Sequence, residues 1–139
     1  MSARALIDTS ALLALIDRRD AWHERCLKAF SVLPLPLGTS AAVLAELLHL
    51  LNPNRRELQV AWGFLRSGAV TVLGIDDSDL PALDELMDKY HDCPMDFADA
   101  TLVHLARRES LVTIFTVDHA DFETYRIPGR RRFRIVPER

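Results

Sequence analysis

Near its start the chain reads Arg-Ala-Leu-Ile-Asp-Thr-Ser-Ala-Leu-Leu-Ala-Leu-Ile, residues 4–16. The apolar run Arg4–Ile7 predicts a short strand, and the helical spacing of the apolar residues in Ser10–Ile16 predicts a helix directly after it. A single acidic residue, Asp8, lies where the strand is expected to end. A buried strand joined to a helix in this way is typical of a parallel sheet that is covered by helices.

The same alternation continues along the chain. Further strands are predicted from short apolar runs at Leu35–Thr39, Val70–Ile75, Val112–Val117 and Phe133–Val136. Further helices are predicted over Trp22–Val32, from a Ser40 cap to Leu51, from Asn52 and Pro53 to Gly68, from Ser78 to Tyr90 and, after a loop at His91–Met95, over Asp96–Glu109. We therefore expect an α/β fold, a three-layer α/β/α sandwich with a mostly parallel central sheet, in a single domain over residues 1–139.

The composition of the 139 residues is that of an ordinary globular protein, with 49% hydrophobic and 27% charged residues. Cys26 and Cys93 lie far apart, which provides neither a disulfide framework nor the spacing of zinc ligands. The apolar run Ala5–Ile7 is too short for a secretory signal. The longest later run, Ala41–Leu51, is too short to span a bilayer. These features predict a soluble, cytoplasmic protein with no contact to a membrane.

Four acidic residues occupy positions where a charge is unexpected. Glu46 is the only formal charge in Ala41–Leu51, a helix so apolar that we expect the helix and this carboxylate to be buried. Asp8 and Asp118 each follow an expected strand, and Asp99 lies in the first turn of an expected helix. The carboxyl ends of parallel strands and the N-termini of the following helices meet at one edge of a sheet. We therefore expect these four carboxylates to converge there.

Each of these acids also has a structural alternative. Asp96 is expected to be the N-cap of the helix that contains Asp99, and the helix dipole favours both carboxylates. Asp8 could simply cap the first helix, and Asp118 could hold a turn. Glu46 has no backbone donor in the middle of a helix, so its structural alternative is an ion pair with a distant arginine.

Converging carboxylates raise one another's pKa values unless a cation lies between them. The chain has two lysines, Lys28 and Lys89, and neither follows an expected strand. A set of oxygen ligands without Cys or His suits Mg²⁺ or Mn²⁺ better than zinc. The sequence therefore predicts a Mg²⁺ or Mn²⁺ site at this edge of the sheet.

Four segments, taken in this order, resemble the PIN domain, a family of metal-dependent nucleases. They are Leu6–Ala14, Thr39 and Ser40 followed by Glu46, Asp96–Ala100, and Phe115–Phe122. The resemblance spans nearly the whole chain, and in size and layout the chain is similar to VapC-type toxins, the ribonucleases of toxin–antitoxin pairs. It implies a PIN-like fold and a metal-dependent endoribonuclease that cleaves RNA phosphodiester bonds.

The resemblance also implies a role for individual residues. Asp8 and Asp99 would be the main direct metal ligands, and Glu46 and Asp118 would bind directly or through water; these four are the implied catalytic residues. Supporting positions are those of Ser10, Thr116, Asp96 and Asp121. Of these, Asp121 lies close enough to Asp118 in the sequence to share its role.

The implied partners are an RNA substrate, a cognate antitoxin protein and a second copy of the chain. Residues 1–125 hold 19 acids against 11 Lys and Arg, whereas residues 126–139 hold six Arg against one Glu. Arg130, Arg131 and Arg132 are therefore candidates for RNA binding, the alternative being a solvated tail. The contact surface between two copies could include Leu47, Leu48, Leu50, Leu51, Trp62 and Phe64. The alternative is that these residues belong to the core of one copy.

Two other functions fit part of the pattern: a housekeeping PIN nuclease of RNA processing, and a non-catalytic, receiver-like signalling module that binds Mg²⁺. A receiver would carry an acidic pair after the first strand and a lysine after a late one, but Asp8 is followed by Thr9 and no lysine follows Tyr90. Glu46 and His49 form the E-x-x-H pair of di-iron proteins only once. His49 is therefore expected inside the protein.

Overall fold

The computed structural model of the protein describes residues 2–139. Its centre is a five-stranded sheet in the order β3-β2-β1-β4-β7, with every neighbouring pair parallel. The strands are β1 (Leu6–Ile7), β2 (Leu37–Thr39), β3 (Val70–Val72), β4 (Thr113–Phe115) and β7 (Arg134–Val136). All five predicted strands are present, each shorter than the apolar run that predicted it.

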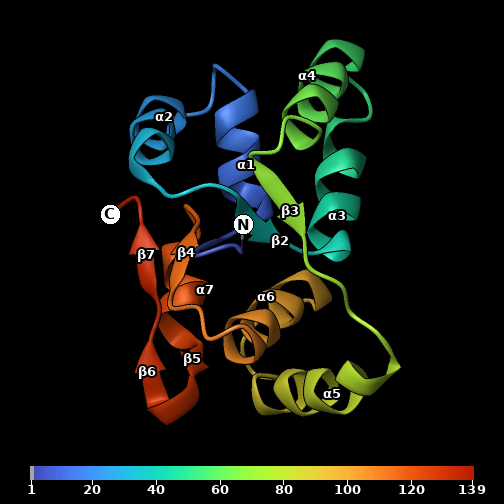
Figure 1. The fold of residues 1–139 in the computed structure, drawn as a ribbon, viewed down its shortest axis with the longest axis vertical. Helices are drawn as coiled ribbons and strands as arrows, with labels where there is room; N and C mark the ends of the chain where they lie inside the picture. The colour runs from blue at the N-terminus through green and yellow to red at the C-terminus, as the bar shows by residue number, and fades with distance from the viewer. Residues whose placement is uncertain (1) are drawn as a thin grey trace.

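Helices cover both faces of this sheet. Figure 1 shows α1 (Thr9–Ile16), α2 (His23–Val32), α3 (Ala41–Leu51) and α4 (Arg55–Leu65) on one side, and α5 (Leu80–Lys89) and α6 (Phe97–Arg108) on the other. The predicted three-layer α/β/α sandwich with a parallel sheet is confirmed. Among residues 2–139, no helix is both long enough and apolar enough to cross a membrane.

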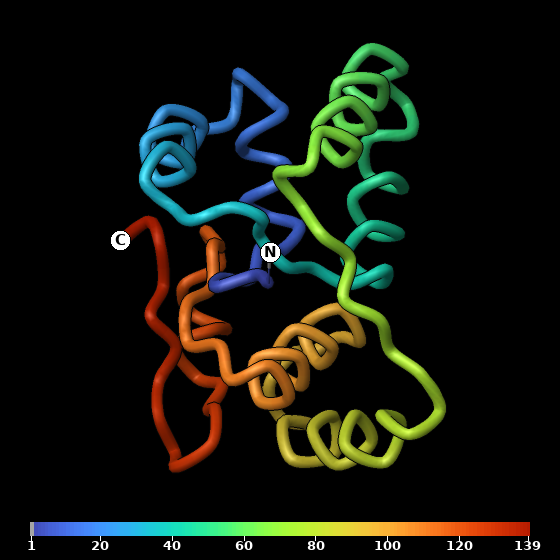
Figure 2. Tube along the Cα trace, viewed as in Figure 1, coloured from blue at the N-terminus to red at the C-terminus, as the bar shows by residue number. Residues whose placement is uncertain are grey.

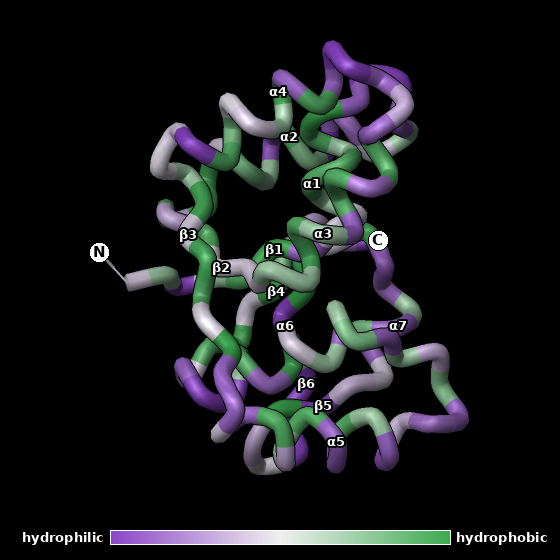
Figure 3. The backbone as a smooth tube through the Cα atoms, turned by 90° about the vertical axis from the view of Figure 1, so that its right-hand side faces the viewer, coloured by the Kyte–Doolittle hydropathy of each residue, from purple (hydrophilic) through white to green (hydrophobic). Residues whose placement is uncertain are grey.

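The side chains in the middle of the sheet are fully buried. Leu6 and Ile7 of β1 and Ile114 and Phe115 of β4 are fully buried, and Figure 3 shows these strands as hydrophobic segments between the helical layers. The chain enters at the central strand and leaves along the edge strand β7 (Figure 2). Burial of these side chains stabilises the sheet by roughly 1.5–3 kcal/mol each.

Side-chain caps fix where three of the helices begin. Asp8 accepts a hydrogen bond from the Ala11 N–H at 3.1 Å, and Ser40 accepts one from the Val43 N–H at 3.2 Å. Asp96 was predicted to be the N-cap of α6, and its Oδ1 accepts from the Asp99 N–H at 2.8 Å. Since the capped ends of α1 and α3 follow β1 and β2 directly, these helices begin at the carboxyl edge of the sheet.

The predicted start of the fourth helix at Asn52 and Pro53 is wrong. The N–H of Asn52 bonds to the His49 carbonyl and ends α3. Asn54 is the N-cap of α4: its Oδ1 accepts from the Glu57 N–H at 3.0 Å, and its Nδ2 donates to Glu57 Oε1 at 2.8 Å. A side-chain pair three residues apart therefore fixes the boundary, and the proline lies in the turn.

The segment after β4 contains elements that the periodicity did not predict. Helix α7 (His119–Thr124) follows Asp118, and β5 (Arg126–Ile127) pairs antiparallel with β6 (Arg131–Arg132) across the turn η2 (Pro128–Arg130). Earlier in the chain, between β3 and α5, lies another short 3₁₀ turn, η1 (Asp77–Asp79). These elements are too short to show a full helical or strand period, so apolar spacing carries little signal for them.

Candidate active site

A cavity of about 150 Å³ opens at the carboxyl edge of the sheet. It is lined by Asp8, Thr9, Ser10, Val43, Glu46, Pro94, Asp96, Ala98, Asp99, Leu102, Asp118 and Asp121. Six of these twelve lining residues are acidic, and none is Lys, Arg or His. The chain moves outward from β1 to β2 and β3 and then returns to the other side of β1 with β4. The cavity therefore lies where open α/β sheets bind their ligands.

Asp8 is held by hydroxyl groups from two elements. Ser10 donates to Asp8 Oδ1 at 2.7 Å, and Thr116, just after β4, donates to Asp8 Oδ2 at 2.6 Å. Both hydroxyl oxygens in turn accept backbone N–H groups, of Val117 at 3.1 Å and of Asp118 at 2.9 Å. Because these N–H groups occupy acceptor positions, the hydroxyl protons are directed at the carboxylate of Asp8.

Asp8 and Asp99 have strongly raised pKa values. Burial raises the pKa of Asp8 to about 6, against the lowering effect of the Thr116 and Ser10 hydroxyls. Burial raises the pKa of Asp99 to about 7, and the negative charge of Asp96 adds to it. The charged forms of both carboxyls are thus disfavoured in the folded protein, because burial removes the water that would stabilise the charge.

Tyr125, which the sequence analysis did not single out, holds the carboxylate of Asp99. Its side chain is fully buried, and its hydroxyl donates to Asp99 Oδ2 at 3.0 Å. The ring packs edge-on against Phe122 at 5.3 Å and Tyr90 at 5.1 Å between ring centroids. No sequence signal marked it, because Tyr125 is the extended C-cap residue after the short helix α7.

Asp121 lies beside Asp118 in α7 and also lines the cavity. Its pKa is raised by burial and by the neighbouring carboxyl of Asp118. Asp118 stands directly before α7 and makes no capping bond with its side chain. The carboxyl group of Asp118 is therefore not engaged as a helix cap.

The expectation that Glu46 and its helix are buried on nearly every side is wrong. Glu46 is half-buried and lines the cavity, and the helix exposes Ala45, His49 and Leu50, the last by 52%. His49 is therefore on the surface and not inside. The reason is that α3 packs through one stripe, which includes Leu47 and Leu51, and leaves its other face without a covering element.

The other residues predicted for binding do not line this cavity. Arg130, Arg131 and Arg132 are exposed in the β5–β6 hairpin and contribute nothing to the cavity lining. Of the six apolar residues considered for contact between copies, Leu47 and Leu51 are core residues, and Leu50 and Trp62 are exposed by 52% and 47%. Phe64 packs against Phe30 with 5.5 Å between ring centroids.

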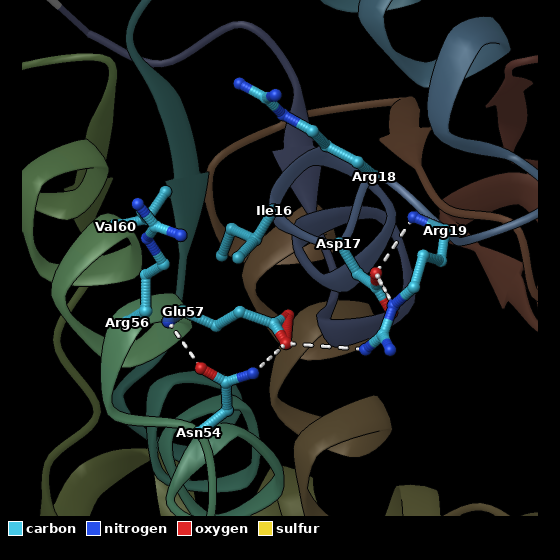
Figure 4. Close-up of a pocket in the computed structure, with 8 residues that line it drawn as sticks. All are labelled: Ile16, Asp17, Arg18, Arg19, Asn54, Arg56, Glu57 and Val60. Atoms are coloured by element: carbon cyan, nitrogen blue, oxygen red, sulfur yellow. Dashed lines mark hydrogen bonds and ion pairs between the residues drawn. The ribbon is translucent and has the colours of Figure 1, made fainter.

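A larger hollow, of about 460 Å³, lies between the end of α1 and the start of α4 (Figure 4). Both acids of its lining pair with Arg19, which contacts Asp17 at 3.3 Å and Glu57 at 3.8 Å. Hydrogen bonding by the Arg19 N–H lowers the pKa of Asp17. Because its lining holds three arginines and two acids, this hollow lacks the excess negative charge that distinguishes the cavity around Asp8.

Comparison with known proteins agrees with this parallel α/β fold and identifies the family. The PIN domain family model matches residues 5–127, and the chain belongs to the PIN domain family. Ribonuclease VapC26 of Mycobacterium tuberculosis is 31% identical over 135 residues, which cover 95% of this chain and 99% of that protein.

Two crystal structures share the fold. VapC20 of Mycobacterium tuberculosis, described as a toxin that cleaves the sarcin-ricin loop, superposes with a TM-score of 0.75 at 24% identity, over 83% of this chain and 90% of the other. PAE2754 from Pyrobaculum aerophilum gives a TM-score of 0.52 at 22% identity, over 88% and 84% of the two chains.

Proposed function

We propose that this protein is a metal-dependent endoribonuclease and the toxin of a VapBC-type toxin–antitoxin pair, formed by one domain over residues 1–139. One observation carries the proposal: six carboxylates line a single cavity at the switch point of the sheet, with no basic residue in the lining. The membership in the PIN family and the likeness to a VapC ribonuclease support it. We expect the protein to act in the cytoplasm, where its RNA substrate is found.

The side chains present fit a hard divalent cation. Every ionisable group in the lining supplies carboxylate oxygen, the ligand that Mg²⁺ and Mn²⁺ prefer. Within residues 2–139, no three His, Cys, Asp or Glu side chains are arranged as a finished metal cage. Mg²⁺ keeps several waters and is usually bound through one or two carboxylates, so its binding does not require such a cage. We assign the direct contacts to Asp8 and Asp99, with Glu46 and Asp118 binding directly or through water.

The chemistry follows from this ligand set. A bound Mg²⁺ or Mn²⁺ ion activates water and neutralises negative charge on a phosphodiester. Ser10 and Thr116 hold the Asp8 carboxylate, and Tyr125 holds that of Asp99, so both acids are oriented before substrate arrives. The apolar part of the lining consists of Val43, Pro94, Ala98 and Leu102.

RNA must approach a surface that is mostly acidic. The exposed arginines Arg130, Arg131 and Arg132 of the β5–β6 hairpin are the basic groups that we assign to RNA phosphates. A small antitoxin that carries a basic or aromatic segment would bind the same acidic cavity and block it. A homodimer is part of the proposal, and of the six apolar residues considered for it Leu50 and Trp62 are clearly exposed.

The decisive experiment is an RNA cleavage assay with Mg²⁺ or Mn²⁺, and with EDTA, using the wild-type protein and Asp8→Asn. Cleavage that requires the metal and disappears in the folded variant supports the proposal. Cleavage that persists in EDTA and in the variant contradicts it and indicates a contaminating nuclease. A short reading frame directly upstream that encodes a protein able to bind this one distinguishes the toxin from a housekeeping PIN nuclease.

The receiver-like alternative is not supported by the strand order. Numbered along the chain, the five sheet strands lie in the order 3-2-1-4-5. Receivers have the flavodoxin-like order 2-1-3-4-5. The cavity lining also contains no lysine, so the basic residue expected of a receiver is missing from it.

A further inference from the structure

A shallow apolar hollow of about 570 Å³ adjoins the acidic cavity. It is lined by Ala41, Ala42, Ala45, Glu46, Asp96, Phe97 and Ala98. Glu46, Asp96 and Ala98 line both spaces, so the two are continuous. We call this hollow, between the first turns of α3 and α6, the Phe97 shelf.

Phe97 is the aromatic residue of the shelf. It is the first residue of α6, two positions before Asp99, and it is 46% exposed. Among residues 2–139, its ring stacks on no other aromatic ring. The remaining apolar lining consists of alanines, whose short side chains leave open space beside the ring.

The charges on the shelf restrict what can occupy it. Both ionisable lining residues, Glu46 and Asp96, are acids, and the lining contains no Lys, Arg or His. A phosphate group would be repelled here. A flat, neutral ring with apolar faces can stack on an exposed aromatic side chain that has small residues beside it. Nucleobases of single-stranded RNA are such rings, and they stack on aromatic side chains in this way.

We propose that the Phe97 shelf binds a nucleobase of the RNA substrate, stacked on the Phe97 ring, next to the phosphodiester that the acidic cavity cleaves. The inference rests on the proposed nuclease function and adds a base-binding subsite to it. A base held on the shelf positions the adjoining phosphodiester over the cavity, because binding away from the reacting atoms reduces the entropy that must be lost for reaction.

The test measures stacking directly. Single-stranded RNA that carries the fluorescent base 2-aminopurine is titrated with the protein in Ca²⁺, chosen as an oxygen-liganded cation to replace Mg²⁺. The variants are Phe97→Ala, Phe97→Leu, which keeps an apolar side chain without the ring, and Phe97→Tyr, which keeps the ring. Leu80→Ala is the matched control, because Leu80 is the first residue of α5 and is 52% exposed.

The wild-type protein should quench the fluorescence at one position of the RNA. Phe97→Ala and Phe97→Leu should lose the quenching and weaken RNA binding by about 5-fold to about 150-fold, the range measured for stacking of one base. Phe97→Tyr and Leu80→Ala should behave as wild type. Thermal melts of each variant establish that α6 is intact.

Four outcomes overturn the inference. Wild-type affinity and quenching in Phe97→Leu would mean apolar contact without stacking. A change in oligomeric mass of Phe97→Ala, with unchanged RNA affinity per chain, means that a second copy covers the shelf. If the wild-type protein cleaves the same RNA in Mg²⁺ but never quenches, the subsite alone is wrong; if it neither binds nor cleaves RNA, the proposed function also falls.

Discussion

Replacing Asp99 by asparagine should stabilise the metal-free protein. The Asp99 carboxyl lies in the first turn of α6, with Asp96 three residues before it and the Tyr125 hydroxyl as its one hydrogen-bond donor. Because its pKa is about 7 in the folded protein and 3.8 in the unfolded chain, ionising Asp99 costs more free energy in the folded state. The Asp99→Asn substitution removes the charge, and the side-chain oxygen of the asparagine can still accept from Tyr125.

The size of the effect follows from the pKa. The pKa of Asp99 is raised from 3.8 to about 7, and each pH unit corresponds to about 1.4 kcal/mol. An upper value for the cost of ionising Asp99 at pH 8 is therefore about 4 kcal/mol. The carboxyl borders an open cavity, so we halve this value for solvent screening and expect a gain of about 2 kcal/mol.

The stability difference between Asp99→Asn and the wild-type protein should depend on pH in a defined direction. Well below pH 3.8, Asp99 is protonated in both the folded and unfolded states, and the variant should have no advantage. The advantage should develop as the pH rises from about 4 to about 7 and stay constant above that range. Bound Mg²⁺ should reverse the order, because a ligand that binds only the folded state stabilises the wild-type protein.

The assay is urea unfolding in EDTA at pH 4 and pH 8, followed by circular dichroism. Asp84→Asn is the control, since it removes the same charge from an exposed position in α5 that does not line the cavity. Its effect should stay within about 0.5 kcal/mol. An Asp99→Asn variant that is no more stable than wild type at pH 8, or equally more stable at pH 4, refutes the reasoning.

Further predictions concern pH, metal binding and RNA. In EDTA, wild-type stability in thermal melts should fall as the pH rises from about 4 to about 7, because the folded-state pKa of Asp8 is about 6 and that of Asp99 about 7, both above 3.8. Tyr125→Phe keeps the packed ring but loses a bond to a charged group, so calorimetry should show Mg²⁺ binding weakened by about tenfold; unchanged affinity would show that the hydroxyl does not orient Asp99. Changing Arg130–Arg132 to Ala should weaken RNA binding equally across sequences and reduce its salt dependence, whereas an unaltered salt slope would leave these arginines as a solvated hairpin.

The sequence predicted the sheet because its strands are short, buried and apolar, and a parallel sheet leaves few other ways to bury them. It did not predict the burial of Glu46 correctly. An apolar helix is expected to be covered on every side, but α3 exposes Leu50 by 52% and His49 as well. Composition records what a helix could bury, whereas the neighbouring elements determine what it does bury.

The site was predictable only in part for a similar reason. Asp8, Asp99 and Asp118 could be placed at one edge because strand ends and helix starts meet there. Tyr125 could not, because it reaches Asp99 from the segment after α7, whose short elements have no clear period. Contacts that depend on the path of an irregular segment are not encoded in local spacing.

Two similarly buried aspartates show why we propose Asp8, and not Asp79, as a metal ligand. Asp79 is 7% exposed and Asp8 is 6% exposed. The Asp76 N–H, His104 and Arg108 all bond to Asp79 and lower its pKa to about 2. The bonds of Asp8 come from neutral donors, and burial outweighs them to raise its pKa to about 6. Neutral donors orient a carboxylate without cancelling its charge, so Asp8 stays available to a cation, whereas Asp79 is already compensated.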